Sequence, residues 1–278
     1  MRGLRLHVRR WGDQSLPRLF LLHGWLDVSA SFAPLVAPLL DRWQVLAPDA
    51  RGFGYSEWPQ DGYWFQDYVG DFEGLLDHYA PQGRVPLVGH SMGAQIAALY
   101  SGLRPERVAK LVCLDGIGLP DMPPAKAPKR IRAWLDELRA LPQQQHYPSF
   151  EVLAERVRRR HPQLTPEKAM FVARCWGRED GRGRISLLAD PKHRMNGPNL
   201  YRAAEAEEVW RQITAPTLFL DAGDSEFSKI MSEEERSRRR ACFGKQQVRV
   251  IPGSGHMMHF DQPEATAAAI GEFLADGR

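Results

Sequence analysis

The strongest chemical signal in the sequence is a serine between two glycines, in the run Gly89-His90-Ser91-Met92-Gly93. A short apolar run over 85–88 precedes it and a helical pattern follows it. At such a strand-to-helix junction the chain turns sharply and projects the serine hydroxyl, and larger side chains at the glycine positions would clash with neighbouring backbone. The hydroxyl then lies at a helix N-terminus, which favours a developing negative charge. We therefore predict that Ser91 is a nucleophile.

A nucleophilic serine needs a general base, and two histidines near the C-terminus are candidates. His256 and His259 lie between a strand-like run over 247–251 and a final helical pattern. An imidazole on such a loop can accept the hydroxyl proton and return it to a leaving group. Gly253 and Gly255 would let the loop bend back over the strands. We predict that His256 is the base and that His259 is a histidine of a surface loop.

The negatively charged oxygen formed during attack needs hydrogen-bond donors. His23-Gly24-Trp25 follows a strand-like apolar run, and a loop at the end of a neighbouring strand can aim a backbone N–H at the carbonyl oxygen under attack. We predict that the backbone N–H groups of Trp25 and Met92 form this oxyanion hole. His23 and Gly24 are expected to border the substrate.

In their order along the chain these motifs resemble the α/β-hydrolase fold, and in particular its small bacterial esterases and thioesterases. The order is His23-Gly24-Trp25, then Asp49-Ala50-Arg51-Gly52-Phe53-Gly54-Tyr55-Ser56, then the Ser91 turn and Gly255-His256. The resemblance covers about 4–114 and 216–274. It implies a Ser-His-acid hydrolase without a cofactor, and a structural role for Asp49 and Arg51.

The resemblance also implies a third catalytic residue, an acid that orients the histidine. The family usually places this acid after the strand that here spans 216–220, at the position that Ser225 occupies. A minority of the family carries it after the strand that follows the nucleophile helix, where this chain has Asp115. We predict Asp115 as the acid, with Asp224 as the alternative.

The elements that must position these residues follow from the hydrophobic pattern. Strand-like and helical runs alternate over the first 115 residues, and the alternation resumes at Pro216. Alternation of this kind predicts an α/β fold with a mostly parallel sheet flanked by helices, whose active site lies at the carboxyl ends of the strands. Between 116 and 206 the alternation stops and helical patterns dominate. We predict a core domain of 1–115 and 207–278, interrupted by a helical cap over 116–206.

Aromatic and sulfur-containing side chains near the motifs predict a small, largely apolar acyl substrate. We expect Trp58, Trp134 and Met257 to contact it. The expected activity is hydrolysis of a carboxylic ester or thioester through an acyl-enzyme. A carbon–carbon bond hydrolase, a perhydrolase and a non-catalytic ligand-binding receptor on the same fold remain open alternatives.

Two arginine-rich runs stand out against the modest overall charge. They are Arg156–Arg160 and Arg236–Arg240, and the second follows Glu233–Glu235 at spacings that allow ion pairs along a helix. We expect both runs to be solvated helix faces. The first could alternatively attract an anionic leaving group such as a coenzyme A thioester.

Composition limits the partners. The net charge is only +3, which gives no reason to expect nucleic acid or an anionic membrane as partner. No apolar run approaches the roughly 18 residues of a membrane span, and the N-terminus lacks the pattern of a secretory signal, so a cytoplasmic monomer or homodimer is expected. Cys113, Cys175 and Cys242 show no ligand spacing, so we expect free thiols and no metal.

Overall fold

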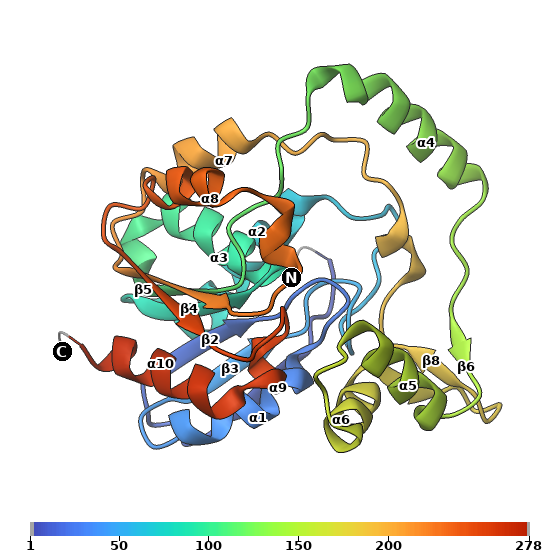
Figure 1. Cartoon of the computed structure of the whole chain (residues 1–278), viewed down its shortest axis with the longest axis horizontal. Helices are drawn as coiled ribbons and strands as arrows, with labels where there is room; N and C mark the ends of the chain where they lie inside the picture. The colour runs from blue at the N-terminus through green and yellow to red at the C-terminus, as the bar shows by residue number, and fades with distance from the viewer. Residues whose placement is uncertain (1–2, 277–278) are drawn as a thin grey trace.

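The computed structural model describes residues 3–276, apart from the side chains of 227 and 228. It centres on a seven-stranded sheet with the order β1-β3-β2-β4-β5-β9-β10 (Figure 1). β1 runs antiparallel to β3, and the other neighbouring strands are parallel, which confirms the predicted mostly parallel sheet. The strands are β1 (Val8–Trp11), β2 (Arg18–Leu22), β3 (Gln44–Pro48), β4 (Val85–His90), β5 (Val108–Leu114), β9 (Thr217–Ala222) and β10 (Gln246–Ile251).

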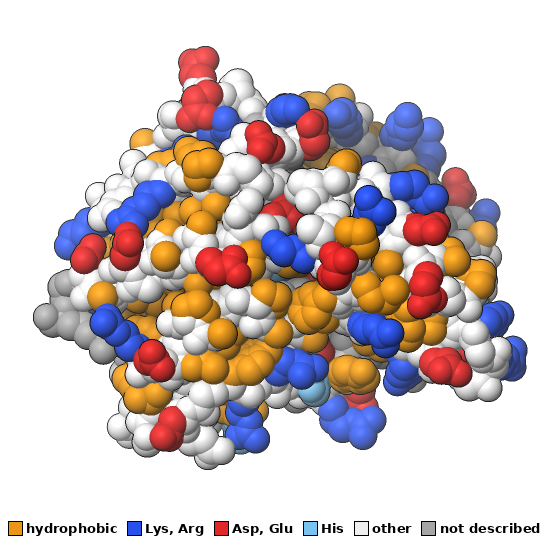
Figure 2. Space-filling view, turned by 60° about the horizontal axis from the view of Figure 1, so that its bottom comes forward, with side chains coloured by type: hydrophobic (Ala, Val, Ile, Leu, Met, Phe, Trp, Pro, Cys, Tyr) orange, Lys and Arg blue, Asp and Glu red, His pale blue; other side chains and the backbone are white. Residues whose placement is uncertain are grey.

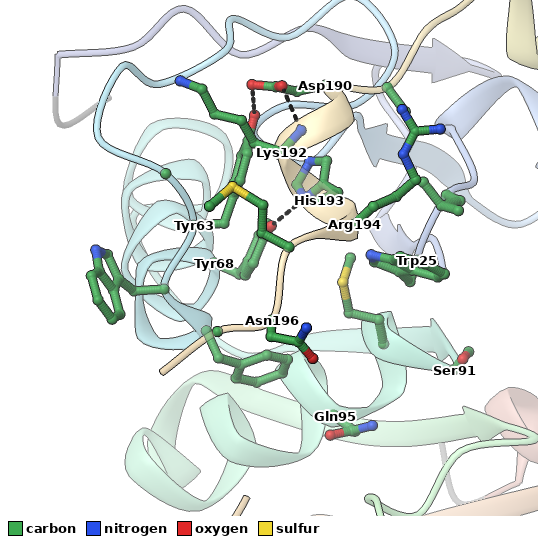
Figure 3. A pocket seen from close by; sticks show the side chains of 18 of the residues that line it. Trp25, Tyr63, Tyr68, Ser91, Gln95, Asp190, Lys192, His193, Arg194 and Asn196 are labelled. Carbon is green, nitrogen blue, oxygen red and sulfur yellow. Dashed lines mark hydrogen bonds between the residues drawn. The ribbon is translucent and has the colours of Figure 1, made fainter. Parts of the chain in front are cut away.

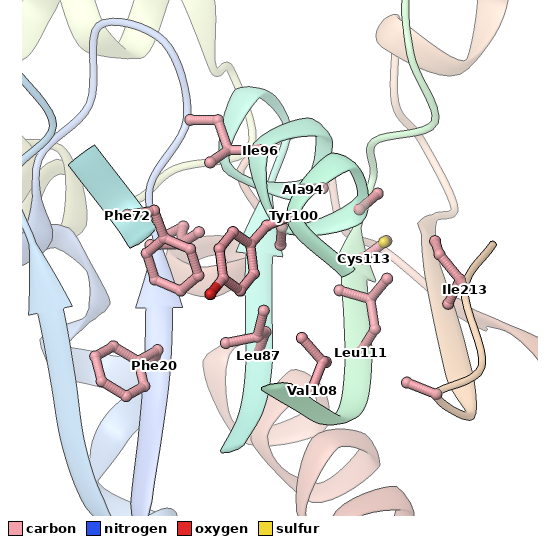
Figure 4. Close-up of a cluster of buried hydrophobic side chains, with 14 of the residues drawn as sticks. Phe20, Phe72, Leu87, Ala94, Ile96, Tyr100, Val108, Leu111, Cys113 and Ile213 are labelled. Atoms are coloured by element: carbon pink, nitrogen blue, oxygen red, sulfur yellow. The ribbon is translucent and has the colours of Figure 1, made fainter. Parts of the chain in front are cut away.

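Helices cover both faces of this sheet. α2 (Phe65–Tyr79), α3 (Met92–Leu103) and α7 (Ala203–Trp210) pack on one face, and α1 (Ala33–Val36) and α10 (Pro263–Ala275) pack on the other. Successive strand residues point to opposite faces, so Phe20 joins the first apolar cluster and Leu21 the second. Figure 4 shows Phe72 and Tyr100 packed over the sheet residues of the first cluster. Each fully buried side chain of this size contributes about 1.5–3 kcal/mol of hydrophobic stabilisation.

The remaining helices are short or belong to the inserted region. They are α4 (Ala127–Arg139), α5 (Phe150–Arg160), α6 (Pro166–Trp176), α8 (Glu233–Arg240), α9 (Met258–Asp261) and the 3₁₀ helices η1 (Ser29–Phe32), η2 (Ala37–Leu39), η3 (Pro105–Arg107), η4 (Pro124–Lys126), η5 (Pro191–Arg194) and η6 (Phe227–Ile230). Local capping explains where α5 and α6 begin: Ser149 and Thr165 accept hydrogen bonds from backbone N–H groups of the first turn.

The region between β5 and α7 has a small hydrophobic core of its own. α5 and α6 pack against a second sheet of order β6-β8-β7, formed by β6 (His146–Tyr147), β8 (Ile185–Leu187) and β7 (Gly177–Glu179), whereas α4 lies apart (Figure 1). The expected cap boundary at 206 falls inside α7, where Ala206 and Trp210 belong to the main core cluster. We propose that the cap ends before α7.

The turn after β3 explains the structural role expected of Asp49 and Arg51. The buried carboxylate of Asp49 accepts hydrogen bonds from the ring of His7 at 2.8 Å and from the backbone N–H of Ser29 at 2.7 Å. The guanidinium of Arg51 pairs with Asp71 at 2.6 Å. Together these contacts tie the turn to the N-terminal strand region and to α2.

The arginine-rich helix α8 departs from the expectation of a solvated face. Arg236 forms the expected ion pair with Glu233. Arg239, however, is fully buried, pairs with Glu235 at 2.6 Å and donates to the carbonyl oxygen of Leu119 at 2.7 Å, because this side of α8 packs on the chain that leaves β5. The prediction is therefore wrong for the buried side of this helix.

The mixed charge of the visible surface (Figure 2) and the free cysteine thiols agree with the expectations from the sequence. On the face shown in Figure 2, basic and acidic side chains are interspersed with hydrophobic ones. Cys113, Cys175 and Cys242 are free, as expected. No helix within 3–276 combines the length and the apolar character that crossing a bilayer requires.

Candidate active site

Ser91 occupies the sharp turn between the end of β4 and the start of α3 that the sequence predicts. Its φ of +50° lies in the left-handed region, which non-glycine residues rarely adopt. The backbone N–H of Ser91 donates to the carbonyl oxygen of Leu114 on the neighbouring strand at 3.0 Å, which helps to hold this strained conformation. A Cβ atom at Gly93 would collide with the backbone carbonyl of Leu22. The glycine is therefore required for the close approach of α3 to β2.

Replacing Gly93 with alanine is expected to lower the free energy of unfolding by about 3 kcal/mol, because the collision is with backbone that cannot move aside without disturbing the sheet. Urea denaturation measures the change. Gly271→Ala in α10 is the control, since its Cβ would lie 3.8 Å from the nearest atom of Leu39, and it should raise stability by up to about 1 kcal/mol. Equal effects of the two variants would contradict this account of the turn.

Asp115 lies beside Ser91 because β4 and β5 are neighbouring parallel strands. His90 and Leu114, the last residues of the two strands, are in register, so the next residue of each strand stands at the same edge of the sheet. Asp115 also has a positive φ of 43°, and its backbone N–H donates to the carbonyl oxygen of Leu220 on β9 at 2.9 Å. The Asp115 side chain is 5% exposed.

His256 connects these two residues from the loop after β10. Its Nδ1 lies 2.6 Å from a carboxylate oxygen of Asp115, and its Nε2 lies 3.0 Å from the hydroxyl oxygen of Ser91. When Nδ1–H donates to the carboxylate, the Nε2 lone pair can accept the serine proton. The alternative acid, Asp224, is exposed and contacts the loop through its backbone N–H, which donates to Ser254 at 2.9 Å. The structure thus brings Asp115 to His256.

Ser225 adds a contact that the sequence interpretation missed. Its buried hydroxyl donates to the same oxygen of Asp115 that His256 contacts, at 2.5 Å. The signal was present, because Ser225 occupies the position at which the family usually has its acid. The hydroxyl helps to fix the orientation of the Asp115 carboxylate.

Buried histidines support the loop that carries His256. The Nε2–H of His90 donates to the backbone carbonyl of His256 at 2.8 Å, and burial lowers the pKa of His90 well below its usual value, so the ring is neutral. The prediction that His259 is a surface histidine is wrong: its side chain is fully buried and its Nε2 lies 3.1 Å from the carboxylate of Asp27. Burial raises the pKa of Asp27, but His259, His23 and the indole N–H of Trp176 together outweigh it, and the net shift is downward.

Ser91 and His256 open onto a cavity of about 1540 Å³ (Figure 3). Ser91, His256 and Met92 line it together with Trp25, and Figure 3 shows Ser91 and Trp25 near one another, away from Asp190. Ligand pockets of proteins usually enclose about 300–1000 Å³, so this cavity can hold a substrate that extends well beyond the reacting bond.

A family model described as "alpha/beta hydrolase fold" matches residues 17–263. The chain belongs to this family. Its core sheet, the turn at Ser91 and the position of His256 after the last strand are those that the resemblance implied, and the protein is a hydrolase of the α/β superfamily.

Relatives of this α/β hydrolase have several hydrolytic activities. It is 28% identical over 98% of its length to 2-(acetamidomethylene)succinate hydrolase from Mesorhizobium japonicum, of which the match covers 92%. It is 25% identical to esterase YbfF from Escherichia coli, with 93% of each chain covered. The thioesterase domain from the curacin biosynthetic pathway has the same fold, with a TM-score of 0.88, 22% identity and coverage of 98% of this chain and 96% of that one.

The predicted substrate contacts of this α/β hydrolase separate into two groups. Trp134 and Met257 line the cavity. The other three, His23, Gly24 and Trp58, do not line it. The ring of His23 is buried and accepts a hydrogen bond from the backbone N–H of Ala50 at 2.9 Å. Gly24 packs under the Ser91 turn, and Trp58 borders a separate cavity of about 380 Å³.

The predicted oxyanion donors of this α/β hydrolase lie beside the serine. Trp25 and Met92 both line the cavity with Ser91. A Cβ at Gly24 would lie 3.3 Å from the Cβ of Ser91, so the loop that carries Trp25 packs directly on the turn. None of the hydrogen bonds within 3–276 uses the backbone N–H of Trp25 or Met92. These two groups are available to a developing negative charge.

His193, farther along the wall of this hydrolase's cavity, predicts a dependence of stability on pH. Its ring lies between Phe53 and Tyr63, with centroid distances of 3.8 and 3.6 Å, and burial lowers the pKa of His193 to about 3. In the unfolded chain His193 binds a proton below about pH 6.5. In the folded protein it binds one only below about pH 3. The free energy of unfolding should therefore fall as pH falls through this range.

The variant His193→Phe keeps the stacked ring and removes this titration. We expect its plot of unfolding free energy against pH to be shallower than that of the wild type between pH 6 and pH 4, by about 1.4 kcal/mol per pH unit. Urea denaturation at several pH values measures the slope. Identical slopes would show that His193 is not held neutral.

Proposed function

We propose that this α/β hydrolase cleaves carboxylic esters or thioesters, with Ser91, His256 and Asp115 as its catalytic triad. The observation that carries the proposal is the continuous hydrogen-bond chain from Asp115 through His256 to Ser91, which ends in the large cavity. Related hydrolases, an esterase among them, support this reaction class.

In the first half of the reaction, the hydroxyl of Ser91 attacks the carbonyl carbon of the substrate while Nε2 of His256 accepts its proton. Asp115 holds the ring in the required orientation and stabilises the imidazolium. The negative charge on the carbonyl oxygen is stabilised by the backbone N–H groups of Trp25 and Met92. His256 then protonates the alcohol or thiol, which leaves, and Ser91 carries the acyl group.

In the second half, water attacks the acyl-enzyme. His256 accepts a proton from the water, the same oxyanion donors stabilise the second intermediate, and the proton returns to Ser91 as the acid product leaves. Each proton therefore moves through Nε2 of His256, and the two half-reactions need no other proton donor or acceptor.

The cavity walls support a largely apolar acyl group near the serine. Trp134 of α4, Trp176 of α6 and Met257 beside the catalytic histidine line the cavity. Their burial by the substrate would contribute hydrophobic binding energy without fixing one chain length.

A panel of 4-nitrophenyl esters of increasing acyl length, measured beside acyl-coenzyme A thioesters, tests the proposal. We expect hydrolysis of the esters, with kcat/KM that depends on acyl length. A clear preference for the thioesters would assign the thioester as the substrate class. Failure of the folded protein to hydrolyse any member of the panel would contradict the proposal.

A further inference from the structure

The cavity wall carries more basic than acidic side chains. The carboxylate of Asp190 is already engaged, because it accepts hydrogen bonds from the hydroxyl of Tyr63 and the backbone N–H of Lys192. The other two acidic residues of the wall, Asp61 and Glu205, are exposed. The basic residues that line the cavity are Arg130, Arg156, Arg160, Lys192, Arg194 and Arg202, and the acidic ones are Asp61, Asp190 and Glu205.

These basic side chains lack carboxylate partners. Among the described residues none of the six forms an ion pair. Arg130, Lys192 and Arg194 donate to backbone carbonyl oxygens, which does not neutralise their charge. Buried arginines elsewhere are paired, as Arg51 is with Asp71. The cavity is thus a region of uncompensated positive charge, which favours an anionic ligand.

Helix α5 contributes two of these arginines through its helical phase. Arg158 and Arg159 do not line the cavity and are exposed, so the expectation of a solvated face is right for them. Arg160 is exposed as well, but it lines the cavity, and Arg156 lines the cavity and is half-buried, so the expectation is wrong for Arg156. The residues of α5 that line the cavity are Leu153, Arg156, Val157 and Arg160, with the i, i+3, i+4, i+7 spacing of one helix face.

Arg156 and Arg160 lie on the cavity wall that also contains His256, and His161 connects Arg160 to that histidine electrostatically. Arg156 is half-buried, with its guanidinium carbon 5.8 Å from the ring centroid of Tyr147. His161, next to Arg160, also lines the cavity, and burial together with electrostatic interactions with His256 and Arg160 lowers the pKa of His161 to about 4. At neutral pH His161 is therefore uncharged, and it lies within electrostatic reach of both neighbours.

We propose that Arg156 and Arg160 bind an anionic group, a carboxylate or a phosphate, on the substrate that Ser91 attacks. This inference rests on the proposed function and names the substrate class for the same site. A guanidinium presents paired N–H donors that match the oxygens of both groups, and the apolar neighbours Leu153 and Val157 reduce competition from water. The size of the cavity leaves room for such a group at a distance from the reacting carbonyl.

Two matched pairs of substrates test the proposal. They also show whether the bound anionic group belongs to the acyl chain or to the leaving group. 4-Nitrophenyl hexanoate and mono-4-nitrophenyl adipate have the same chain length and differ in a terminal carboxylate on the acyl side. Butyryl-N-acetylcysteamine and butyryl-coenzyme A share the acyl group and differ in phosphates on the leaving group. We expect wild-type kcat/KM to be at least about 10-fold higher for the anionic member of one pair.

The double variant Arg156→Gln/Arg160→Gln should lower the ratio of anionic to neutral kcat/KM in that pair by about 10-fold or more, to near one, chiefly through KM. Arg159→Gln, on the same helix but outside the cavity, is the matched control and should leave the ratio unchanged. An equal ratio in wild type and double variant, an equal change in the control, or no anionic preference in either pair would overturn the proposal.

Failure of the proposed function can be distinguished from failure of the proposed anion site. If the wild type cleaves neither neutral substrate nor anionic one, the hydrolase proposal fails, and binding of adipate and coenzyme A measured by calorimetry decides on the anion site. Binding by the wild type that the double variant loses would support the site. Absence of binding, or equal binding by the double variant, would overturn it.

Discussion

Replacing Ser91 with alanine is expected to lower kcat for a 4-nitrophenyl ester by about 10⁵-fold to 10⁶-fold, close to the loss seen when a serine hydrolase has no nucleophile. Alanine keeps the Cβ atom and can occupy the same turn, so the hydroxyl is the only group removed. Without it, His256 has no proton to accept and no acyl-enzyme forms. Steady-state kinetics with the purified variant measure the change.

Ser101→Ala is the matched control for the same helix. The hydroxyl of Ser101 is buried in α3 and donates to the carbonyl oxygen of Ala97 at 2.7 Å, away from the cavity. This variant is expected to keep wild-type kcat. A Ser91→Ala protein that retains more than a few per cent of wild-type activity, while folded by circular dichroism, would show that another group is the nucleophile.

Replacing Asp115 with asparagine is expected to lower kcat by about 10⁴-fold while the fold is preserved. The amide can donate to Nδ1 of His256, which favours the tautomer with the proton on Nε2. That tautomer cannot accept the proton of Ser91. The hydroxyl of Ser225 contacts the same position of the side chain and can accept a hydrogen bond from this amide, so kcat is expected to fall more than the free energy of unfolding.

Asp224→Asn is the control for this substitution. Asp224 is exposed, and its contact with the loop runs through the backbone, which the variant keeps. Its kcat should change by less than about 2-fold. The reverse ranking of the two folded variants would assign the acid to Asp224.

Features that depend on neighbouring residues in the chain could be predicted from the sequence. The turn at Ser91 follows from two glycines at a strand-to-helix junction, and the parallel sheet follows from the alternation of strands and helices. The position of Asp115 required one more step, since parallel strands end at a common edge and β5 is the next strand after α3. These parts of the fold and the site depend on local pattern and topology.

Features that depend on packing between distant segments could not be predicted. His259 is buried because it meets Asp27, which lies more than 200 residues earlier in the chain, and nothing near His259 indicates this contact. Ser225 contacts Asp115 only because β5 and β9 are neighbours. The arginines of α5 face two environments because only one side of that helix lines the cavity, and residue type alone does not distinguish Arg156 from Arg159.

Labelling by a fluorophosphonate probe tests the central claim most directly, because the probe reacts with a serine only when an adjacent base activates it. The wild-type protein is incubated with the probe, digested, and mapped by mass spectrometry, with Ser91→Ala treated in parallel. The proposed triad predicts about one probe per chain, attached to Ser91, and no label on the variant. No label on the folded wild type, or a label on another serine, would contradict it.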